Sequence, residues 1–273
     1  MNRSMGVRLA VAGALLLASA WAQALVFAVN EGVTYRVSND EIRARYATIA
    51  SDLSHLLRQP VSVEPVGDYT ALRTGLQNKA YDLALVHPAH VSIAAIRNSG
   101  YRLVAVAKGY EKYQASFLVR ADSPLKSLAD LKGKRLGAPD EDSITSWMVR
   151  AALRDAQVDL GTVAITYTRY QDAVPFFVDN SLTQAGATAA VGLIKEWQAK
   201  GGKVLAQSRA VPIKHVIAAP SLTAQQVAVV RDYLLGLDAS DEGRKKLEPS
   251  KLRGFATFDA AEMMVLGLSL IHI

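Results

Sequence analysis

The sequence has no cysteine among its 273 residues, and this absence excludes several kinds of chemistry. Without cysteine there are no disulfide bonds, no thiolate metal sites, no thiol nucleophile and no lipid-modified N-terminal cysteine. No run of basic residues is interleaved with aromatics, so nucleic-acid binding is not expected. No Gly-x-Ser-x-Gly elbow and no spacing typical of a catalytic triad occur, so the sequence does not predict an enzyme.

Long apolar runs are also missing, apart from one at the N-terminus. A basic leader, residues 1–8, precedes a short apolar run, and Ala22 to Ala24 supply the small side chains that a signal peptidase accepts. The run is too short for a membrane span, so residues 1–24 are predicted to be a cleaved secretory signal, with an uncleaved anchor as the alternative. Export and a disulfide-free body favour a bacterial periplasm.

The chain after residue 24 is long and only moderately charged. Half of all residues are hydrophobic, which is enough for one large domain or two medium ones. Without Arg3 and Arg8, the 29 basic and 25 acidic residues give a formal charge of +4. This mild positive bias suits small anions.

Strand and helix patterns alternate along the first part of the chain. Apolar stretches predict strands at residues 25–30, 59–66, 81–88 and 102–109. Periodic stretches predict helices at residues 40–57, 68–77 and 91–98. The first helix is expected to bury a face that includes Leu56 and Leu57. Asp68 is expected to be the N-cap of the second helix. This alternation favours a mainly parallel sheet covered on both faces.

The same alternation restarts after residue 110, which predicts a second α/β lobe. Strands are expected at residues 115–123, 135–139, 164–170 and 203–208, and helices at 127–131, 143–156 and 170–180, with a further strand and helix before Gly201. After the chain returns to the first lobe, a strand at residues 215–220 and a helix at 223–237 are expected. The chain would cross between lobes near residues 108–115 and 208–215. Residues 25–110 and 214–273 then form the first lobe, residues 111–213 the second, and a ligand cleft lies between them.

One short stretch gathers hydroxyl groups at a predicted helix start. Ser143, Thr145 and Ser146 follow directly after three acidic residues. The first turn of a helix has unpaired N–H groups and a positive dipole end, so it can hold an oxyanion together with neutral hydroxyl donors. Ordinary capping explains one hydroxyl, but three exceed what a cap requires.

The acidic residues before this helix, at positions 140–142, have two interpretations. They can complement the helix dipole while facing solvent, which is the simpler one. One of them could instead accept a hydrogen bond from a protonated oxyanion and so favour ligands that keep a proton.

These stretches carry a resemblance that extends over most of the chain after the signal. Asp68 and Tyr69, then Gly75 and Asp82, and above all residues 110–146 resemble the periplasmic substrate-binding proteins of phosphonate, phosphite or phosphate ABC transporters. The resemblance implies the two-lobed type II periplasmic binding protein fold. It departs from the family pattern at Trp147, where a small residue is common. The family often has an acidic ligand-contacting residue in the later part of the second lobe, and this sequence has no clean equivalent of it.

The resemblance also implies which residues contact the ligand. Ser143, Thr145 and Ser146 would donate hydrogen bonds to it, and Tyr113 or Ser116 on the first crossing would contact it. Tyr35 follows the first strand, where the family presents a first-lobe contact, with Glu31 and Arg36 as nearby alternatives.

His87 and His90 lie three residues apart just after a predicted strand. One imidazole could donate to the anion and make binding respond to pH, or both could be satisfied at a helix start. A shared metal ion is the third interpretation, although no second ligand pair completes a shell. Lys214 and His215 at the second crossing are interpreted as hinge or rim residues, and no cofactor is expected.

The sequence thus predicts a monomeric, non-enzymatic solute-binding protein that closes on a small oxyanion and delivers it to an ABC permease in the inner membrane. A metal or metal-chelate binder and a ligand-sensing partner of a membrane receptor kinase are the alternatives. The apolar end, residues 268–273, has the appearance of a cloning or read-through scar, so no function is assigned to it.

Overall fold

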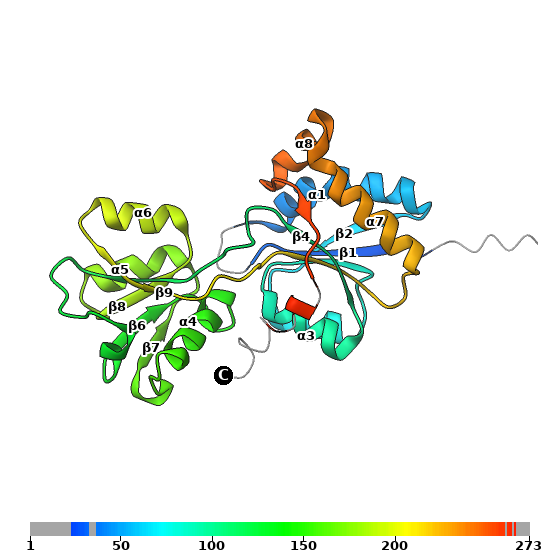
Figure 1. The fold of residues 1–273 in the computed structure, drawn as a ribbon. Helices are drawn as coiled ribbons and strands as arrows, with labels where there is room; N and C mark the ends of the chain where they lie inside the picture. The colour runs from blue at the N-terminus through cyan, green and yellow to red at the C-terminus, as the bar shows by residue number, and fades with distance from the viewer. Residues whose placement is uncertain (1–22, 33–36, 260, 264, 266–273) are drawn as a thin grey trace, which may run out of the picture.

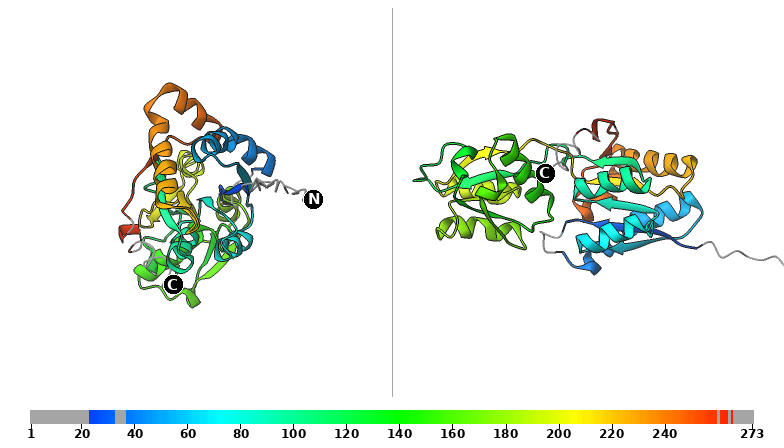
Figure 2. Two further views of the ribbon diagram at one scale, coloured as in Figure 1. Left: turned by 90° about the vertical axis from the view of Figure 1, so that its right-hand side faces the viewer. Right: turned by 90° about the horizontal axis from the view of Figure 1, so that it is seen from below.

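The computed structural model describes residues 23–32, 37–259, 261–263 and 265. These residues form two α/β lobes that lie side by side and are joined by two extended segments (Figures 1 and 2). Residues 1–22 of the predicted signal, Tyr35 and the predicted C-terminal scar lie outside the described residues. Within the described part of the chain, no helix combines the length and apolarity needed to cross a membrane.

The first lobe is built on a six-stranded sheet with the order β11-β4-β10-β3-β1-β2. Its strands are β1 (Leu25–Asn30), β2 (Val61–Pro65), β3 (Leu83–Val86), β4 (Arg102–Ala107), β10 (His215–Ala218) and β11 (Phe255–Ala256). Its helices are α1 (Asn39–Leu57), α2 (Tyr69–Gln77), α3 (Ala89–Ser99), α7 (Ala224–Gly236) and α8 (Asp241–Leu247).

Local sequence explains where the first-lobe helices begin and which faces they bury. The Ser38 side chain accepts from the Glu41 N–H at the start of α1, and Asp68 accepts from the Ala71 N–H at the start of α2, as predicted for Asp68. Leu56 was expected on the buried face of α1, but its exposed fraction is 49%. Leu57 packs against the core as expected, while Leu56 faces away from it.

The second lobe has a five-stranded sheet with the order β7-β6-β8-β5-β9. Its strands are β5 (Ser116–Val119), β6 (Arg135–Ala138), β7 (Ala164–Tyr167), β8 (Ala185–Thr188) and β9 (Lys203–Gln207). Its α-helices are α4 (Ile144–Asp155), α5 (Val174–Asp179) and α6 (Val191–Ala199). Single 3₁₀ turns, among them η3 (Gln171–Ala173), complete the lobe.

Both sheets are mixed, and the two extended segments explain why. The first crossing, residues 108–115, leads into β5, and the second crossing, residues 208–214, leads into β10. Each of these strands enters the middle of its sheet and pairs antiparallel with both neighbours. The predicted mainly parallel sheets are thus confirmed, with one inserted antiparallel strand in each, and β11 adds a further antiparallel strand to the first.

The two crossings pair with each other where they pass between the lobes. Tyr113 and Val211 exchange both backbone hydrogen bonds, at N···O distances of 3.1 and 3.0 Å. The return of the chain to β10 agrees with the predicted second crossing, while the exact lobe boundaries stay a prediction. This two-stranded connection is the natural hinge for a movement of one lobe against the other.

The last elements of the first lobe, α8 and β11, were not predicted from the sequence. One apolar cluster contains Ile93 of α3, Met148 of α4 and Met263, so buried apolar contacts continue from one lobe to the other. The C-terminal part of the described chain therefore helps to hold the lobes together.

Candidate functional site

The start of α4 faces the first crossing and leaves backbone donors unused. Ser143 is the N-cap, and its Oγ accepts from the Ser146 N–H at 3.2 Å. The first hydrogen bond along the helix backbone runs from the Trp147 N–H to the Ser143 carbonyl, at 3.1 Å. The N–H groups of Ile144 and Thr145 therefore have no acceptor inside the helix, and helix starts of this kind can bind anions.

The three predicted hydroxyl groups do not have equivalent positions, although all three residues are buried. Ser143 Oγ donates to Ser146 Oγ at 3.3 Å, and Ser146 Oγ donates to the Pro139 carbonyl at 3.0 Å. Both serines are thus used to shape the loop. Thr145 Oγ1 instead lies 3.3 Å from the hydroxyl of Tyr113. Thr145 is the hydroxyl that is turned toward the crossing.

Tyr113 is held in place by a buried amide that the sequence analysis missed. Gln171 Nε2 donates to the Tyr113 hydroxyl at 3.2 Å. Gln171 Oε1 accepts from Thr188 Oγ1 at 2.8 Å and from the Ala189 N–H at 2.7 Å. A backbone N–H can only donate, so this bond fixes the orientation of the amide. The Tyr113 hydroxyl is therefore an acceptor toward Gln171.

Ser116, the alternative to Tyr113, has a different environment. It is buried at the start of β5, and its Oγ accepts from Gln207 Nε2 at 3.1 Å. Together with Tyr113 it lines a cavity of 460 Å³ between the first crossing and α6. The Ser116 hydroxyl is therefore engaged by Gln207.

His87 and His90 both lie between the lobes. The His87 ring packs edge-on against the Tyr113 ring, with 6.0 Å between centroids. The His90 ring stacks on the Trp147 indole, with 4.7 Å between centroids and 21° between planes. Burial lowers the pKa of His90 to about 3, and burial also holds the pKa of His87 well below its usual value. Both imidazoles are therefore neutral at physiological pH in this arrangement.

Trp147, which departs from the family pattern, makes contacts across the cleft. The indole stacks on His90 of the first lobe, and the Arg150 guanidinium carbon lies 4.8 Å from the indole centroid. Its Nε1 and both ring nitrogens of His90 are buried without a hydrogen-bond partner among the described residues. Such groups are costly to bury, so they mark a place where a ligand or water belongs.

One acidic residue before α4 has a role that the sequence analysis did not anticipate. Asp142 accepts from Arg73 of α2 at 2.7 Å, an ion pair between the lobes. Asp140 Oδ1 accepts from the Asp142 N–H at 2.9 Å and so supports the turn. The expectation that the acids simply face solvent is corrected for Asp142, because it joins the two lobes at the rim of the cleft.

The remaining predicted residues contribute less to this site. Tyr35 and Arg36 lie outside the described residues, and the buried Glu31 accepts from the Tyr46 hydroxyl at 2.7 Å. His215 is hydrogen bonded to Ser92 Oγ and to the Pro212 carbonyl, at 2.6 and 3.2 Å. Within the described ranges, no three His, Cys, Asp or Glu residues are grouped as they would be to hold a metal ion.

Comparison with known proteins identifies relatives of this arrangement. The family model for the periplasmic substrate-binding protein of phosphonate ABC transporters matches residues 32–263. The comparison with curated proteins gives no match.

Several solved structures are similar to this fold. PhnD1 from Prochlorococcus marinus, in complex with methylphosphonate, has a TM-score of 0.70 at 17% identity, covering 90% of this chain and 96% of that one. XAC2383 from Xanthomonas citri, bound to ATP, has a TM-score of 0.76 at 14% identity, covering 91% and 97%. A phosphonate transporter component from Pseudomonas aeruginosa has a TM-score of 0.65 at 17% identity, covering 90% and 85%. At these identities the likeness demonstrates a shared two-lobed fold.

Proposed function

The chain belongs to the family of periplasmic substrate-binding proteins of phosphonate ABC transporters, and we propose that it holds the ligand at the start of α4. Its role is to bind a substrate for a transporter, and it is not an enzyme. The proposed ligand is a phosphonate or a similarly compact oxyanion, such as phosphite or phosphate.

A single observation carries this proposal. The N–H groups of Ile144 and Thr145 have no acceptor within α4, and the Thr145 and Tyr113 hydroxyls lie 3.3 Å apart beside them. A tetrahedral oxyanion presents several acceptors to such a set of donors. Because the donors carry no formal charge, the anion is held by hydrogen bonds and the helix dipole, and release remains easy.

Closure of the lobes completes the proposed site. Tyr113 stands on the hinge, Thr145 on the second lobe and His87 on the first, so a ligand between them contacts both lobes. The Arg73–Asp142 ion pair and the His90–Trp147 stack are the contacts that stabilise the closed arrangement. Capture by closure and release by opening suit delivery to a transporter.

We further propose that residues 1–24 direct export and are removed, that the exported protein is a monomer, and that its partner is an inner-membrane permease. Expression of the full chain in a Gram-negative host, followed by mass measurement of the periplasmic product, tests the first step. A product beginning at Leu25 supports it, and a product that retains Met1 in the membrane fraction contradicts it.

The ligand is tested by calorimetric titration of the exported protein with methylphosphonate, phosphite, phosphate, sulfate, Zn²⁺ and Fe³⁺. We expect saturable binding of at least one phosphorus oxyanion and weaker binding of sulfate, which keeps no proton. Tight binding of a metal ion without binding of any phosphorus oxyanion would contradict the proposed function.

A further inference from the structure

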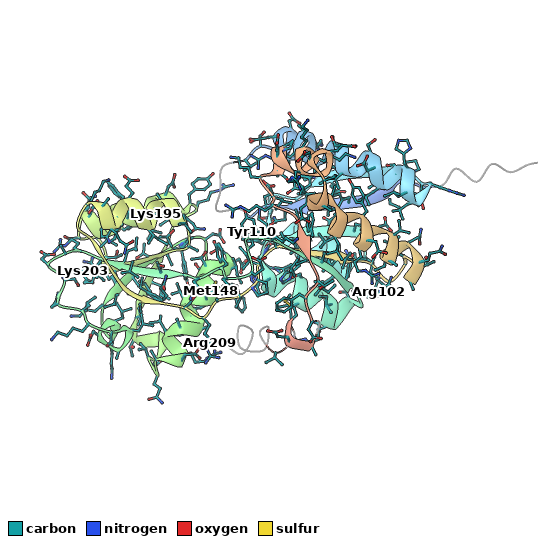
Figure 3. The ribbon with its side chains drawn as sticks, turned by 45° about the horizontal axis from the view of Figure 1, so that its top comes forward. Arg102, Tyr110, Met148, Lys195, Lys203 and Arg209 are labelled. Carbon is teal, nitrogen blue, oxygen red and sulfur yellow. The ribbon has the colours of Figure 1, made fainter. Side chains whose placement is uncertain are left out.

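A cavity of 410 Å³ lies on the first-lobe side of the hinge. Its lining includes Glu31, Arg45, His87, Tyr110, Lys214 and Lys251. Figure 3 shows Tyr110 where the two lobes meet, so this part of the cavity lies beside the junction of the lobes. The volume falls in the range of about 300–1,000 Å³ that is typical of small-molecule pockets.

The unusual feature of this cavity is the side chain of Lys214. The residue is only 6% exposed, and its ammonium lies 4.4 Å from the centroid of the Tyr110 ring. Among the described residues, no carboxylate lies within 4.0 Å of this ammonium and no acceptor hydrogen bonds to it. A buried ammonium without an anionic partner is costly, because the tyrosine face replaces only part of its hydration.

The nearby carboxylates do not neutralise Lys214 because they already have partners. Glu31 accepts from the Tyr46 hydroxyl and from Arg45, and Glu41 also accepts from Arg45. Burial lowers the pKa of Lys214, while the charge of Glu31 opposes that shift. The cavity is lined by the two glutamates that share Arg45 and by two lysines, Lys214 and Lys251. Its charged side chains therefore carry a net positive charge.

The cavity is connected to the start of α4 by two aromatic rings. His87 lines the cavity, and its ring packs edge-on against Tyr113 at 6.0 Å between centroids. The Tyr113 hydroxyl in turn lies 3.3 Å from Thr145 Oγ1. A ligand whose phosphonate is bound at Thr145 would reach the cavity by passing these two rings along the first crossing.

We propose that this cavity receives a carboxylate substituent of the ligand, with Lys214 as its cation, so that the substrate class is phosphonates that carry a carboxylate. This inference rests on the proposed function, since it takes the phosphonate group to be bound at the start of α4. Binding supplies the anionic partner that Lys214 lacks in the described chain.

The test compares ligands that differ only in the substituent. The exported protein is titrated by calorimetry with methylphosphonate, phosphonoacetate, 3-phosphonopropionate and 2-aminoethylphosphonate. We expect at least one carboxylate-bearing phosphonate to bind at least tenfold more tightly than methylphosphonate, and the amine-bearing one to bind no better than methylphosphonate. Equal affinities for methylphosphonate and both phosphonocarboxylates would overturn the inference.

Three variants assign the preference to Lys214. Lys214→Met is expected to abolish the tighter binding of carboxylate-bearing phosphonates while changing methylphosphonate affinity less than threefold. Lys214→Arg is expected to keep part of that tighter binding. Lys195→Met removes one charge from the exposed face of α6, far from the hinge in Figure 3, and should leave the preference intact. Thermal melts establish that each variant is folded.

The outcomes separate this inference from the proposed function. If Lys214→Met weakens methylphosphonate and phosphonoacetate by the same factor, Lys214 acts on the phosphonate or on the fold, and the inference is wrong. If the wild-type protein binds none of the four phosphonates, the inference is wrong, and if it also binds neither phosphite nor phosphate, the proposed function itself fails.

Discussion

The two faces of the cleft differ in how they present charge. The second-lobe face consists of neutral donors at the start of α4, with Thr145 turned toward the hinge. The first-lobe face presents the buried imidazoles of His87 and His90 and, deeper in, the ammonium of Lys214. Under the proposals made above, the second lobe binds the phosphonate group and the first lobe contacts the rest of the ligand.

Removal of the neutral donors should have the largest effect on ligand binding. Thr145→Val with Tyr113→Phe deletes both hydroxyls with little change in volume. We expect methylphosphonate binding to weaken by about 1.5–3 kcal/mol, because hydrogen bonds to a charged group are lost. Calorimetry measures the change, and Ser116→Ala is the control, since its hydroxyl is bonded to Gln207. Equal losses in the control would refute the assignment.

The neutrality of the first-lobe imidazoles predicts a dependence of stability on pH. The pKa of His90 is lowered to about 3 in the folded chain, against its ordinary 6.5, so between these values the unfolded chain binds a proton that the folded chain does not. The free energy of unfolding should therefore fall below pH 6.5 by about 1.4 kcal/mol per pH unit for this histidine, levelling off near pH 3.

Urea unfolding between about pH 7 and pH 5 checks this slope. His90→Phe keeps an aromatic ring against Trp147 but cannot be protonated, so it should flatten the slope by about one proton. His55→Phe, which replaces an exposed histidine on α1, is the matched control. An unchanged slope in His90→Phe would mean that the stack does not keep His90 neutral.

A smaller effect distinguishes the capping serine from the binding threonine. Ser143→Ala removes the acceptor of the Ser146 N–H and should cost about 1 kcal/mol of unfolding free energy. Methylphosphonate affinity should change less than it does in Thr145→Val, because Ser143 Oγ donates to Ser146 and not toward the hinge. Urea unfolding and calorimetry on the same samples separate the two effects. The reverse pattern would show that Ser143 binds the ligand.

The smallest expected effect concerns the rim of the cleft. Arg73→Gln removes the ion pair with Asp142, and both side chains are partly exposed, so ligand affinity should fall by about 0.2–1 kcal/mol. The loss should shrink at high salt, where exposed charges are screened. The charge swap Arg73→Asp with Asp142→Arg should restore affinity, and failure of the swap would mean that the pair does not stabilise closure.

Much of this arrangement could be predicted from local sequence. The bounds of β1, the cap at Asp68 and the start of α4 depend on neighbouring residues, and each agrees with the structure. The antiparallel insertion of β10 and the addition of β11 depend on pairing between distant segments, which periodicity does not report.

The site also combines features that local sequence predicts with features that depend on distant residues. Thr145 was singled out because its hydroxyl lies in a local motif, and Tyr113 because of a family resemblance. Gln171 was missed since no local pattern marks an amide that bonds Thr188 and Tyr113, and the Arg73–Asp142 pair joins residues 69 positions apart. Only folded coordinates bring these partners together.

The account depends most on the claim that the anion is bound by the first backbone N–H groups of α4. Amide ¹H–¹⁵N spectra of the exported protein during titration with methylphosphonate test this claim directly. The account predicts that the Ile144 and Thr145 amide protons shift downfield and saturate together with binding. Saturable binding that leaves both amides unshifted would contradict it.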